Sequence, residues 1–115
     1  MVEYQWGIFW ADLEPTKGSE QAGTRPVLVI SAEEVNQALP IVTVLSLTSV
    51  KPGRKVYPIE TLLSSKMAGL PKDSIAMAHQ IRSISKDRIG EKCGNITTEE
   101  TKEQIKTALK IYLDL

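Results

Sequence analysis

The pattern of apolar and polar residues predicts β-structure in the first half of the chain. Residues 4–13 form an apolar run in which both alternating faces are apolar. Trp6, Ile8 and Trp10 share one parity, and Phe9, Ala11 and Leu13 share the other. A strand that is apolar on both faces is typical of a sheet interior. We therefore expect Trp6 and Trp10 to belong to the core, although either indole would also be able to stack on a base.

Further strands are expected at residues 26–31 and 41–49, the second of which is rich in Val, Ile and Thr. Pro26 is expected at the first strand position, where no ladder donor is needed. Residues 14–24 form a loop interrupted by Pro15, Gly18 and Gly23. Residues 56–60 resemble an edge strand, because Pro58 cannot serve an interior ladder.

The remaining segments are less regular. A helical turn is expected at residues 33–36 and a short helix at residues 61–66, while residues 74–85 form either one long strand or two short ones. Thr97-Thr98-Glu99-Glu100 fits a capping box. Beyond it, Ile105, Ala108, Leu109 and Tyr112 recur at helical spacing and predict the core face of a C-terminal helix. The pattern predicts an α+β fold, a small bent antiparallel sheet with that helix and one or two short helices.

Composition narrows the classes of protein. The 115 residues suffice for one domain, residues 1–115. Fourteen basic and fourteen acidic side chains give a net charge of zero, which excludes a highly basic nucleic-acid coat protein and an acidic tail protein. The single cysteine, Cys93, excludes a disulfide framework or a multi-cysteine zinc site within one chain, and we expect it to be inert.

Targeting signals and cofactor sites are not evident in the sequence. No apolar run approaches the ~18–20 residues that a bilayer requires. The start of the chain has neither the basic opening nor the apolar centre of a signal peptide. We therefore expect a cytoplasmic protein that neither contacts a membrane nor uses a metal or another cofactor.

The most informative stretch runs from Gly18 to Pro26 and reads Gly-Ser-Glu-Gln-Ala-Gly-Thr-Arg-Pro. Pro26 pushes Arg25 into an extended conformation at a loop-to-strand junction. A guanidinium held there suits a phosphate. The two glycines have the spacing of a nucleotide-triphosphatase loop, but Thr24-Arg25 replaces its Lys-Ser/Thr pair and a strand follows where a helix should begin, which argues against that interpretation.

A partner for Arg25 follows from strand register. If residues 26–31 and 41–49 form an antiparallel hairpin, opposed residue numbers add up to about 72–73, because the connection is centred near Asn36. Arg25 then lies opposite Leu47 or Thr48. Opposed side chains approach within ~5 Å, so Arg25 and the Thr48 hydroxyl would share one phosphate. A one-residue shift would turn Thr48 away.

The residues that follow Thr48 and Ser49 carry a local positive charge. Lys51, Arg54 and Lys55 lie between Glu34 and Glu60 without an intervening acid. This charge would favour a polyanion although the total charge is zero. We therefore expect Ser49 and Lys51 to contact such a polyanion, while a solvated loop is the simpler alternative for the lysines.

With these residues in view, the chain resembles the MazF/PemK family of toxin–antitoxin ribonucleases. The resemblance lies in the continuous block from Ile8 to Ser31, in Leu45-Ser46-Leu47-Thr48-Ser49 and in Gln80-Ile81-Arg82-Ser83-Ile84. It covers essentially the whole chain, and the first block is long and specific.

The resemblance implies a sequence-specific, metal-independent endoribonuclease that acts on single-stranded RNA. It implies a β-barrel-like sheet, a homodimer, and an antitoxin whose disordered tail covers the RNA groove. Arg25 and Thr48 match the family's catalytic pair. Residues of the Gly-Ser-Glu-Gln loop and of the Gln-Ile-Arg segment are similar to those that contact RNA, and we expect Ser19, Gln21 and Gln80 to do so.

The general base is less clear from the sequence. Glu20 is the first candidate, because it lies in the same loop as Arg25, with loop shaping or contact with a base edge as the alternative. His79, the only histidine, has an ordinary pKa near ~6.5 that suits acid–base work. In an unbroken strand, however, His79 and Gln80 would point to opposite faces.

Two alternative functions remain at this point. Gyrase-inhibiting toxins have a related fold but depend on a C-terminal tryptophan segment, whereas this chain ends Ile-Tyr-Leu-Asp-Leu. The other alternative is a catalytically inactive module that binds RNA or a protein partner. The presence of both Arg25 and Thr48 argues against that alternative.

Overall fold

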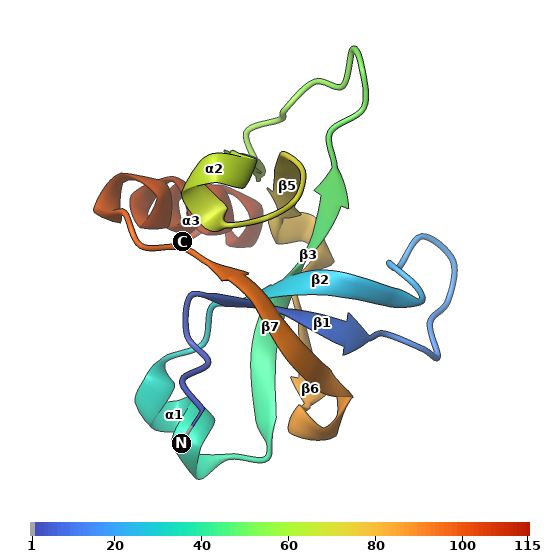
Figure 1. The fold of residues 1–115 in the computed structure, drawn as a ribbon, viewed down its shortest axis with the longest axis vertical. Coiled ribbons are helices and arrows are strands. Elements are labelled where there is room, and N and C mark those ends of the chain that lie inside the picture. The colour runs from blue at the N-terminus through green and yellow to red at the C-terminus, as the bar shows by residue number, and fades with distance from the viewer. Residues whose placement is uncertain (1) are drawn as a thin grey trace.

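The computed structural model describes residues 2–115 and shows a strongly bent antiparallel sheet with a helix at its C-terminal end (Figure 1). The strand order is β4-β5-β3-β2-β1-β7, and β6 pairs with β3 beside this path. The elements in chain order are β1 (Gly7–Asp12), β2 (Thr24–Val29), α1 (Glu33–Ala38), β3 (Ile41–Ser49), β4 (Glu60–Leu63), α2 (Ser65–Ala68), β5 (Ser74–Met77), η1 (Ala78–Gln80), β6 (Arg82–Ser85), η2 (Lys86–Arg88), β7 (Ile89–Asn95) and α3 (Glu99–Leu113). The α+β class predicted from the pattern is confirmed.

Two apolar clusters stabilise the two faces of the bent sheet. One lies under α2 and α3 and includes Ile8, Leu28 and Ile105. The other covers the opposite face and includes Phe9, Val27 and Val42. Because β1 and β2 contribute alternate residues to both clusters, they are sheet-interior strands, as the two-faced apolar pattern predicts. In residues 2–115, no helix is both long and apolar enough to cross a membrane.

β1 is interior but shorter than predicted. The chain turns at Tyr4 to Trp6, where Trp6 has a φ of 66°, before the strand begins. Trp6 packs against the first cluster, but Trp10 is 42% exposed, so the prediction of a core position for Trp10 is wrong. Trp10 has the same strand parity as Ile8, but it lies two residues further along, where the helices no longer cover this face.

The second strand begins two residues before its predicted start, so Pro26 is its third residue rather than its first. This position tolerates proline because the ladder between β2 and β3 begins only at Val27. At Pro26, β2 has just one hydrogen-bonded neighbour, β1. β3 has the predicted bounds, and the helical turn expected after β2 forms α1, which extends to Ala38.

The segment between β3 and β5 differs most from the expectation. Residues 56–60 do not form the predicted strand, because the chain turns there and the Glu60 amide donates to the Tyr57 carbonyl at 2.8 Å. The edge strand is β4, in the place of the helix expected at residues 61–66. The short helix comes later as α2, which begins where the Ser64 side chain accepts from the Met67 amide.

Of the two alternatives expected for residues 74–85, the structure has the two short strands, β5 and β6, and the 3₁₀ turn η1 separates them. The sequence analysis missed β7, whose two glycines and charged residues give a weak strand signal. Pairing with β1 forms this strand. Gly94 also allows β7 to approach α2, since a Cβ there would lie 2.4 Å from the Ala68 carbonyl oxygen.

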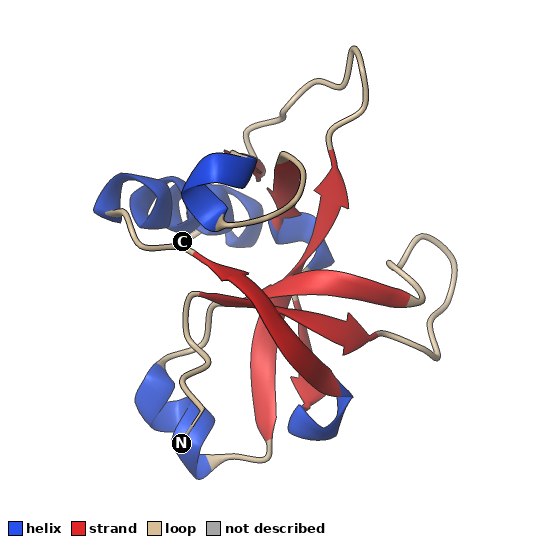
Figure 2. Cartoon of the chain, in the orientation of Figure 1, coloured by secondary structure: helices blue, strands red, loops and turns tan. Residues whose placement is uncertain are grey.

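The C-terminal helix α3 is confirmed, with Thr98 as the N-cap residue (Figure 2). Its buried face consists of Thr101, Ile105 and Ala108, and it packs against β4 and η1. Tyr112 is 44% exposed, so its predicted place on the core face is wrong. The buried residues of α3 end at Ala108, and Tyr112 lies one turn beyond them.

Candidate active site

A cavity of about 320 Å³ opens between the start of β2 and the end of β3. The paired residues of these strands, such as Val27 with Ser46 and Leu28 with Leu45, have numbers that add up to 73. The predicted register is therefore confirmed, and its continuation places Arg25 level with Thr48. The β2–β3 ladder ends at Val27 and Ser46, however, whereas β3 continues to Ser49 and pairs there with β5 on its other edge. The resulting gap between the strands forms the cavity.

The residues that line this cavity come from five parts of the chain and include both members of the predicted pair. They are Trp10, Thr24, Arg25, Pro26, Leu47, Thr48, Ser49, Leu70, Pro71, Lys72, Ser74 and Cys93. Consecutive strand residues normally point to opposite faces, yet residues 24–26 and 47–49 all contribute to the lining. The cavity therefore lies between the ends of the two strands rather than over one face of the sheet.

Arg25 is held by the loop that precedes it. Its Nε donates to the Ala22 carbonyl at 3.0 Å, and its side chain is half-buried. Gly23 allows the turn into β2 because it adopts a φ of 78°. Among residues 2–115, no carboxylate lies within ion-pair distance of Arg25. A positioned cation without an internal counter-ion is a suitable ligand for a substrate anion.

The far wall supplies a hydroxyl and a second cation. Thr48 is half-buried near the end of β3, and its neighbour Ser49 is exposed. Lys72 lies on the turn that leads into β5 and contributes a further positive charge. The lining contains two basic side chains but no carboxylate and no imidazole. The site is thus suited to binding an anion, and it offers hydroxyl groups to orient that anion.

Cys93 also lines the cavity, and its environment supports the expectation that it is inert. Burial raises the pKa of the Cys93 thiol, while a backbone hydrogen bond opposes this effect only in part. The thiolate, which is the reactive form, is therefore scarce at neutral pH. In residues 2–115, no group of three or more His, Cys, Asp or Glu side chains is placed to hold a metal ion.

Glu20, the first candidate base, does not line the cavity. It is exposed, and its carboxylate accepts a hydrogen bond from the Lys17 amide, while its own amide donates to the Lys17 carbonyl. The base of this loop is closed by the Leu13 amide, which donates to the Gly23 carbonyl. Glu20 therefore shapes the loop in this conformation and is not brought together with Arg25 and Thr48.

Gln80 binds the same loop from across the sheet. Its Nε2 donates to the Ser19 carbonyl at 3.1 Å, and its Oε1 accepts from the Gln21 amide at 3.2 Å. The loop backbone thus uses both ends of the Gln80 amide, and the sequence pattern did not predict this role. Ser19 is exposed and Gln21 is half-buried, and neither lines the cavity.

His79, the second candidate base, also lies outside the cavity lining. It belongs to the turn η1 rather than to a strand, so the alternation argument does not apply to it. Its Nδ1 is buried without a hydrogen-bond partner among residues 2–115, and its charge acts on Glu60. The structure therefore associates His79 with the loop after β3 and not with Arg25.

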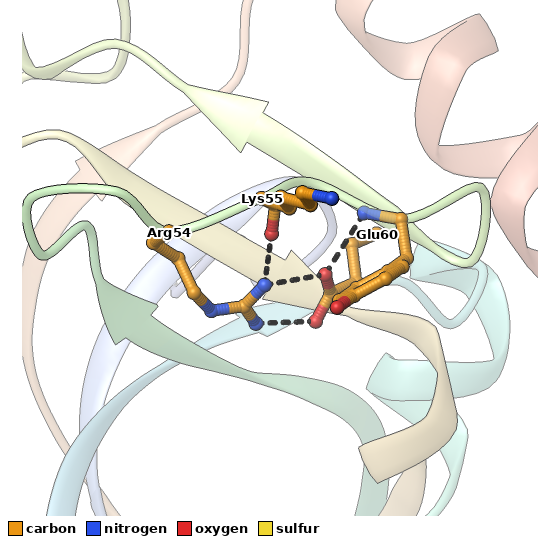
Figure 3. A network of polar contacts seen from close by, with 4 residues as sticks. Arg54, Lys55 and Glu60 are labelled. Carbon is orange, nitrogen blue, oxygen red and sulfur yellow. Dashed lines mark hydrogen bonds and ion pairs between the residues drawn. The ribbon is translucent and has the colours of Figure 1, made fainter.

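The loop after β3 is held by an ion pair between Arg54 and Glu60 (Figure 3). The Arg54 guanidinium donates to both Glu60 carboxylate oxygens, at 3.1 and 2.7 Å, and also to the Lys55 carbonyl. The Tyr57 amide donates to Glu60 as well, at 3.1 Å. Arg54 is thus neutralised, which corrects the expectation that all three basic residues favour a polyanion. Lys51 is exposed on this loop, outside the cavity lining.

The Glu60 carboxyl is 2% exposed and has a lowered pKa. Burial by itself would raise the pKa, but the hydrogen bonds from Arg54 and the Tyr57 amide outweigh it, with smaller contributions from the charges of Arg54 and His79. Glu60 therefore remains ionised in the folded protein and restrains the loop.

Several lining residues were not assigned to a site from the sequence, among them Trp10, Leu70 and Lys72. Trp10 was assigned to the core, and the other two lie on a turn that gave no strand or helix signal. One signal for Trp10 was available in the sequence. Trp10 lies two positions after Ile8, close to the end of its strand and to the loop that leads to Arg25. Only the course of α2 and β5 reveals that residues 70–72 face this loop.

We predict that Gln80→Ala loosens the loop without unfolding the domain. The Gln21 amide loses its acceptor, so its hydrogen exchange becomes faster. The free energy of unfolding changes by only about 1 kcal/mol, as is usual for a single hydrogen-bonding side chain. Hydrogen–deuterium exchange with mass spectrometry measures both effects. Gln104→Ala, on α3, is the matched control, and equal exchange of the loop in the two variants would contradict the proposed contact.

A second prediction concerns Glu60→Gln. Because the folded-state pKa of Glu60 lies below its ordinary value, ionised Glu60 stabilises the fold above about pH 4.5. This contribution is lost as the pH falls through the lowered pKa. We expect the variant to melt several degrees below the wild type at pH 7, and the difference to shrink on acidification. Thermal unfolding of both proteins, measured from pH 7 down to below about pH 4.5, tests this prediction.

The control for that measurement is Glu99→Gln, which removes an exposed carboxylate from the Lys102 pair. An exposed pair contributes little to stability, so we expect its melting curve to follow the wild type. A Glu60→Gln variant that melts with the wild type at pH 7 would show that the ion pair does not restrain the loop.

Comparison with known proteins gives relatives over the full length of the chain. Residues 4–113 match the family model described as the PemK-like, MazF-like toxin of type II toxin–antitoxin systems. The endoribonuclease MazF9 of Mycobacterium tuberculosis is 38% identical over 113 residues, which cover 94% of this chain and 93% of the relative. The endoribonuclease EndoA of Bacillus subtilis is 34% identical over 115 residues, with coverage of 100% and 97%.

Solved structures share the fold. MazF from Deinococcus radiodurans aligns with a TM-score of 0.81 at 25% identity and covers 100% of this chain and 99% of that one. A mycobacterial endoribonuclease, solved in complex with its cognate antitoxin, aligns with a TM-score of 0.79 at 24% identity, with coverage of 99% and 97%. The family match, the identity to both curated relatives and the shared fold agree with one another, and this chain belongs to the PemK-like, MazF-like toxin family of type II toxin–antitoxin systems.

Proposed function

We propose that this protein is the toxin of a toxin–antitoxin pair and acts as a sequence-specific, metal-independent endoribonuclease on single-stranded RNA, including messenger RNA. The observation that carries the proposal is the cavity at which Arg25 and Thr48 meet without a neighbouring carboxylate. The two curated relatives named as endoribonucleases support it. A site of this kind binds a phosphate anion and presents one hydroxyl beside it.

The proposed reaction uses the ribose 2′-hydroxyl as the nucleophile. The 2′ oxygen forms a bond to the adjacent phosphorus, and the bond from phosphorus to the 5′ oxygen of the next nucleotide breaks. One proton leaves the 2′-hydroxyl, and one proton is added to the departing 5′ oxygen. The products are a 2′,3′-cyclic phosphate and a 5′-hydroxyl end. The protein must therefore align the chain, stabilise the phosphorane charge and assist two proton movements.

Arg25 is the proposed charge stabiliser. It is held through Nε by the Ala22 carbonyl, so little reorganisation is needed when the phosphorane forms. Arginine remains protonated because its pKa is above ~12, which makes electrostatic stabilisation a better role for it than proton transfer. Thr48, level with Arg25 in the continued strand register, is proposed to hold a non-bridging oxygen and fix the geometry of attack.

For the general base we propose Glu20, with a condition that its position imposes. Its carboxylate is bound to the Lys17 amide and points to the loop's own backbone, so it must leave that amide to reach the 2′-hydroxyl. Glu20 is exposed, and its carboxylate is bound to a backbone amide of its own loop, so a rotation of the side chain suffices to release it. His79 is a weaker candidate because it does not line the cavity and its charge acts on Glu60.

The proposed RNA-binding surface extends from the cavity along the two loops that flank it. Figure 1 shows both loops, residues 13–23 and 50–59, projecting from the strand ends. Ser49 lines the cavity itself, and Lys51 adds charge on the second loop. Ser19 and Gln21 are proposed to contact RNA from the first loop. Gln80 is proposed to act through this loop, whose backbone it binds.

The proposed partners follow from the family. We propose a homodimer, and an antitoxin whose disordered tail occupies the RNA groove and thereby blocks cleavage. A mycobacterial endoribonuclease of this fold has been solved with its cognate antitoxin, which supports a similar pairing here. An activity on messenger RNA would be exercised in the cytoplasm.

We predict that Arg25→Ala and Thr48→Ala each abolish most RNA cleavage. Loss of one preorganised donor typically slows a reaction ~10²–10³-fold. Purified protein is mixed with a long single-stranded RNA in excess chelator, and the 5′-hydroxyl ends are mapped. The wild type is expected to cut at specific sites, and added antitoxin is expected to prevent cutting. Light scattering is expected to give a dimer for the wild type and both variants.

Lys106→Ala is the control, because it removes a cation from the exposed face of α3. Its cleavage rate should equal that of the wild type. Near-normal cleavage by Arg25→Ala would remove Arg25 from the mechanism. Absence of cleavage by properly folded wild type, together with inhibition of DNA supercoiling, would overturn the ribonuclease proposal in favour of a gyrase inhibitor.

We also predict that Glu20→Gln slows RNA cleavage. If Glu20 is the general base, the cleavage rate of the variant no longer shows the fall on acidification that protonation of the base causes in the wild type. Glutamine can still accept from the Lys17 amide through its side-chain oxygen, so the loop keeps its shape while the base is lost. Cleavage rates measured as a function of pH distinguish these roles. A variant with the wild-type rate and pH profile would show that Glu20 only shapes the loop.

A further inference from the structure

Trp10 is an exposed indole at the wall of the cavity that contains Arg25 and Thr48. Its side chain is 42% exposed, although the strand around it is buried on both faces at Ile8, Phe9 and Ala11. Indole is a large apolar surface, and leaving it half in water forgoes burial that would stabilise the fold. An indole in that position offers its ring to a ligand.

The other tryptophan provides a contrast within the same chain. Trp6 is half-buried and packs against the cluster under α3, with the Lys102 ammonium 5.7 Å from its ring centroid. Trp6 is therefore accounted for by the fold. The sequence contains only these two tryptophans, so Trp10 is the one whose position the core does not explain.

The surroundings of Trp10 divide the cavity into an apolar and a polar part. Leu70 and Pro71, on the turn before β5, supply apolar surface to the same lining as Trp10. Arg25 and Thr48 supply the polar part. In the β1–β2 ladder Trp10 pairs with Pro26, the residue that follows Arg25, so the two parts lie within one residue of each other along β2.

We propose that the apolar part of this cavity binds one unpaired nucleobase adjacent to the scissile phosphate, and that the base stacks on Trp10. This inference rests on the proposed ribonuclease function and identifies a residue that grips the substrate. A phosphate and a base one nucleotide apart require an anion site and a flat apolar surface in immediate proximity. The cavity supplies both, and nucleobases stack readily on aromatic side chains.

Size and charge agree with this occupant. A volume of about 320 Å³ is at the lower end of the range for small-ligand pockets, which suits one nucleotide rather than a long apolar segment. The lining carries the charges of Arg25 and Lys72 and lacks a carboxylate, so a nucleotide is favoured over an apolar or basic peptide group. An aromatic side chain of a protein partner is the other occupant that the test must distinguish.

The first measurement uses Trp10 as its own reporter. The Trp6→Phe variant leaves Trp10 as the sole tryptophan, so its fluorescence reports only on the cavity. The probe is a short single-stranded RNA that spans a mapped cleavage site and carries 2′-deoxyribose at the cleaved position. We expect the RNA to quench the fluorescence in proportion to binding. An RNA of the same length with an abasic residue beside the scissile phosphate should bind without this quench.

The second measurement is a double-mutant cycle on cleavage. We expect Trp10→Ala to lower kcat/KM roughly tenfold to hundredfold on intact RNA, in keeping with the usual strength of base stacking. Trp10→Phe should retain most of the activity, which excludes misfolding as the cause. On RNA with the abasic residue, wild type and Trp10→Ala should cleave alike, because the stacking partner is already absent. Tyr112→Ala, on α3, removes an aromatic ring of similar exposure and should leave kcat/KM unchanged.

The outcomes separate this inference from the function on which it rests. If the wild type cleaves RNA but Trp10→Ala is as active, or if the effects of Trp10→Ala and the abasic residue simply add, Trp10 does not stack on that base. If the wild type does not cleave, the proposed function fails independently of Trp10. Quenching by the antitoxin alone, and not by RNA, would assign the cavity to a protein side chain and overturn the proposal.

Discussion

The early end of the ladder between β2 and β3 is the feature on which the site depends. β3 pairs with β2 only from Val44 to Ser46, although the strand itself continues to Ser49. On its other edge β3 pairs with β5 from Leu47 to Ser49, and this pairing holds the end of the strand in place after the ladder with β2 has ended. β2 meanwhile remains paired with β1 as far as Thr24. Two well-paired strands therefore diverge, and the space between them contains Arg25 and Thr48.

Two polar contacts restrain the loops beside that space. Gln80 binds the backbone of the first loop, and Glu60 binds Arg54 and the Tyr57 amide of the second. Both residues belong to the sheet or to the turn beside it. Gln80 holds the first loop at Ser19 and Gln21, the residues that are proposed to contact RNA. Loops held in this way lose less conformational freedom when a substrate binds. The sheet thus supports a surface whose proposed binding residues are largely exposed.

The chemistry of the cavity differs from that of a site built around a general base. Its lining offers fixed positive charge and hydroxyl groups, while Glu20 and His79 both lie outside it. Charge stabilisation is therefore the contribution that this conformation supports most directly, and a proton acceptor must come from a rearranged loop. Such a division suits RNA cleavage, in which the substrate supplies its own nucleophile. It also explains why Arg25 and Thr48 were identified as candidate site residues from the sequence, whereas the general base was not.

Local pattern determined the interior strands, the terminal helix, and the register that aligns Arg25 with Thr48, because alternation, capping and hairpin symmetry are properties of neighbouring residues. The tertiary structure alone decided the positions of β7, Trp10 and Gln80. β7 exists because β1 offers it a ladder, and Trp10 is exposed because the helices that cover Ile8 end before they reach it. Gln80 meets its loop across 59 and 61 residues of sequence, a separation at which no periodic pattern carries information. Contacts of that range depend on how the whole sheet bends, which the packing of all its elements sets together.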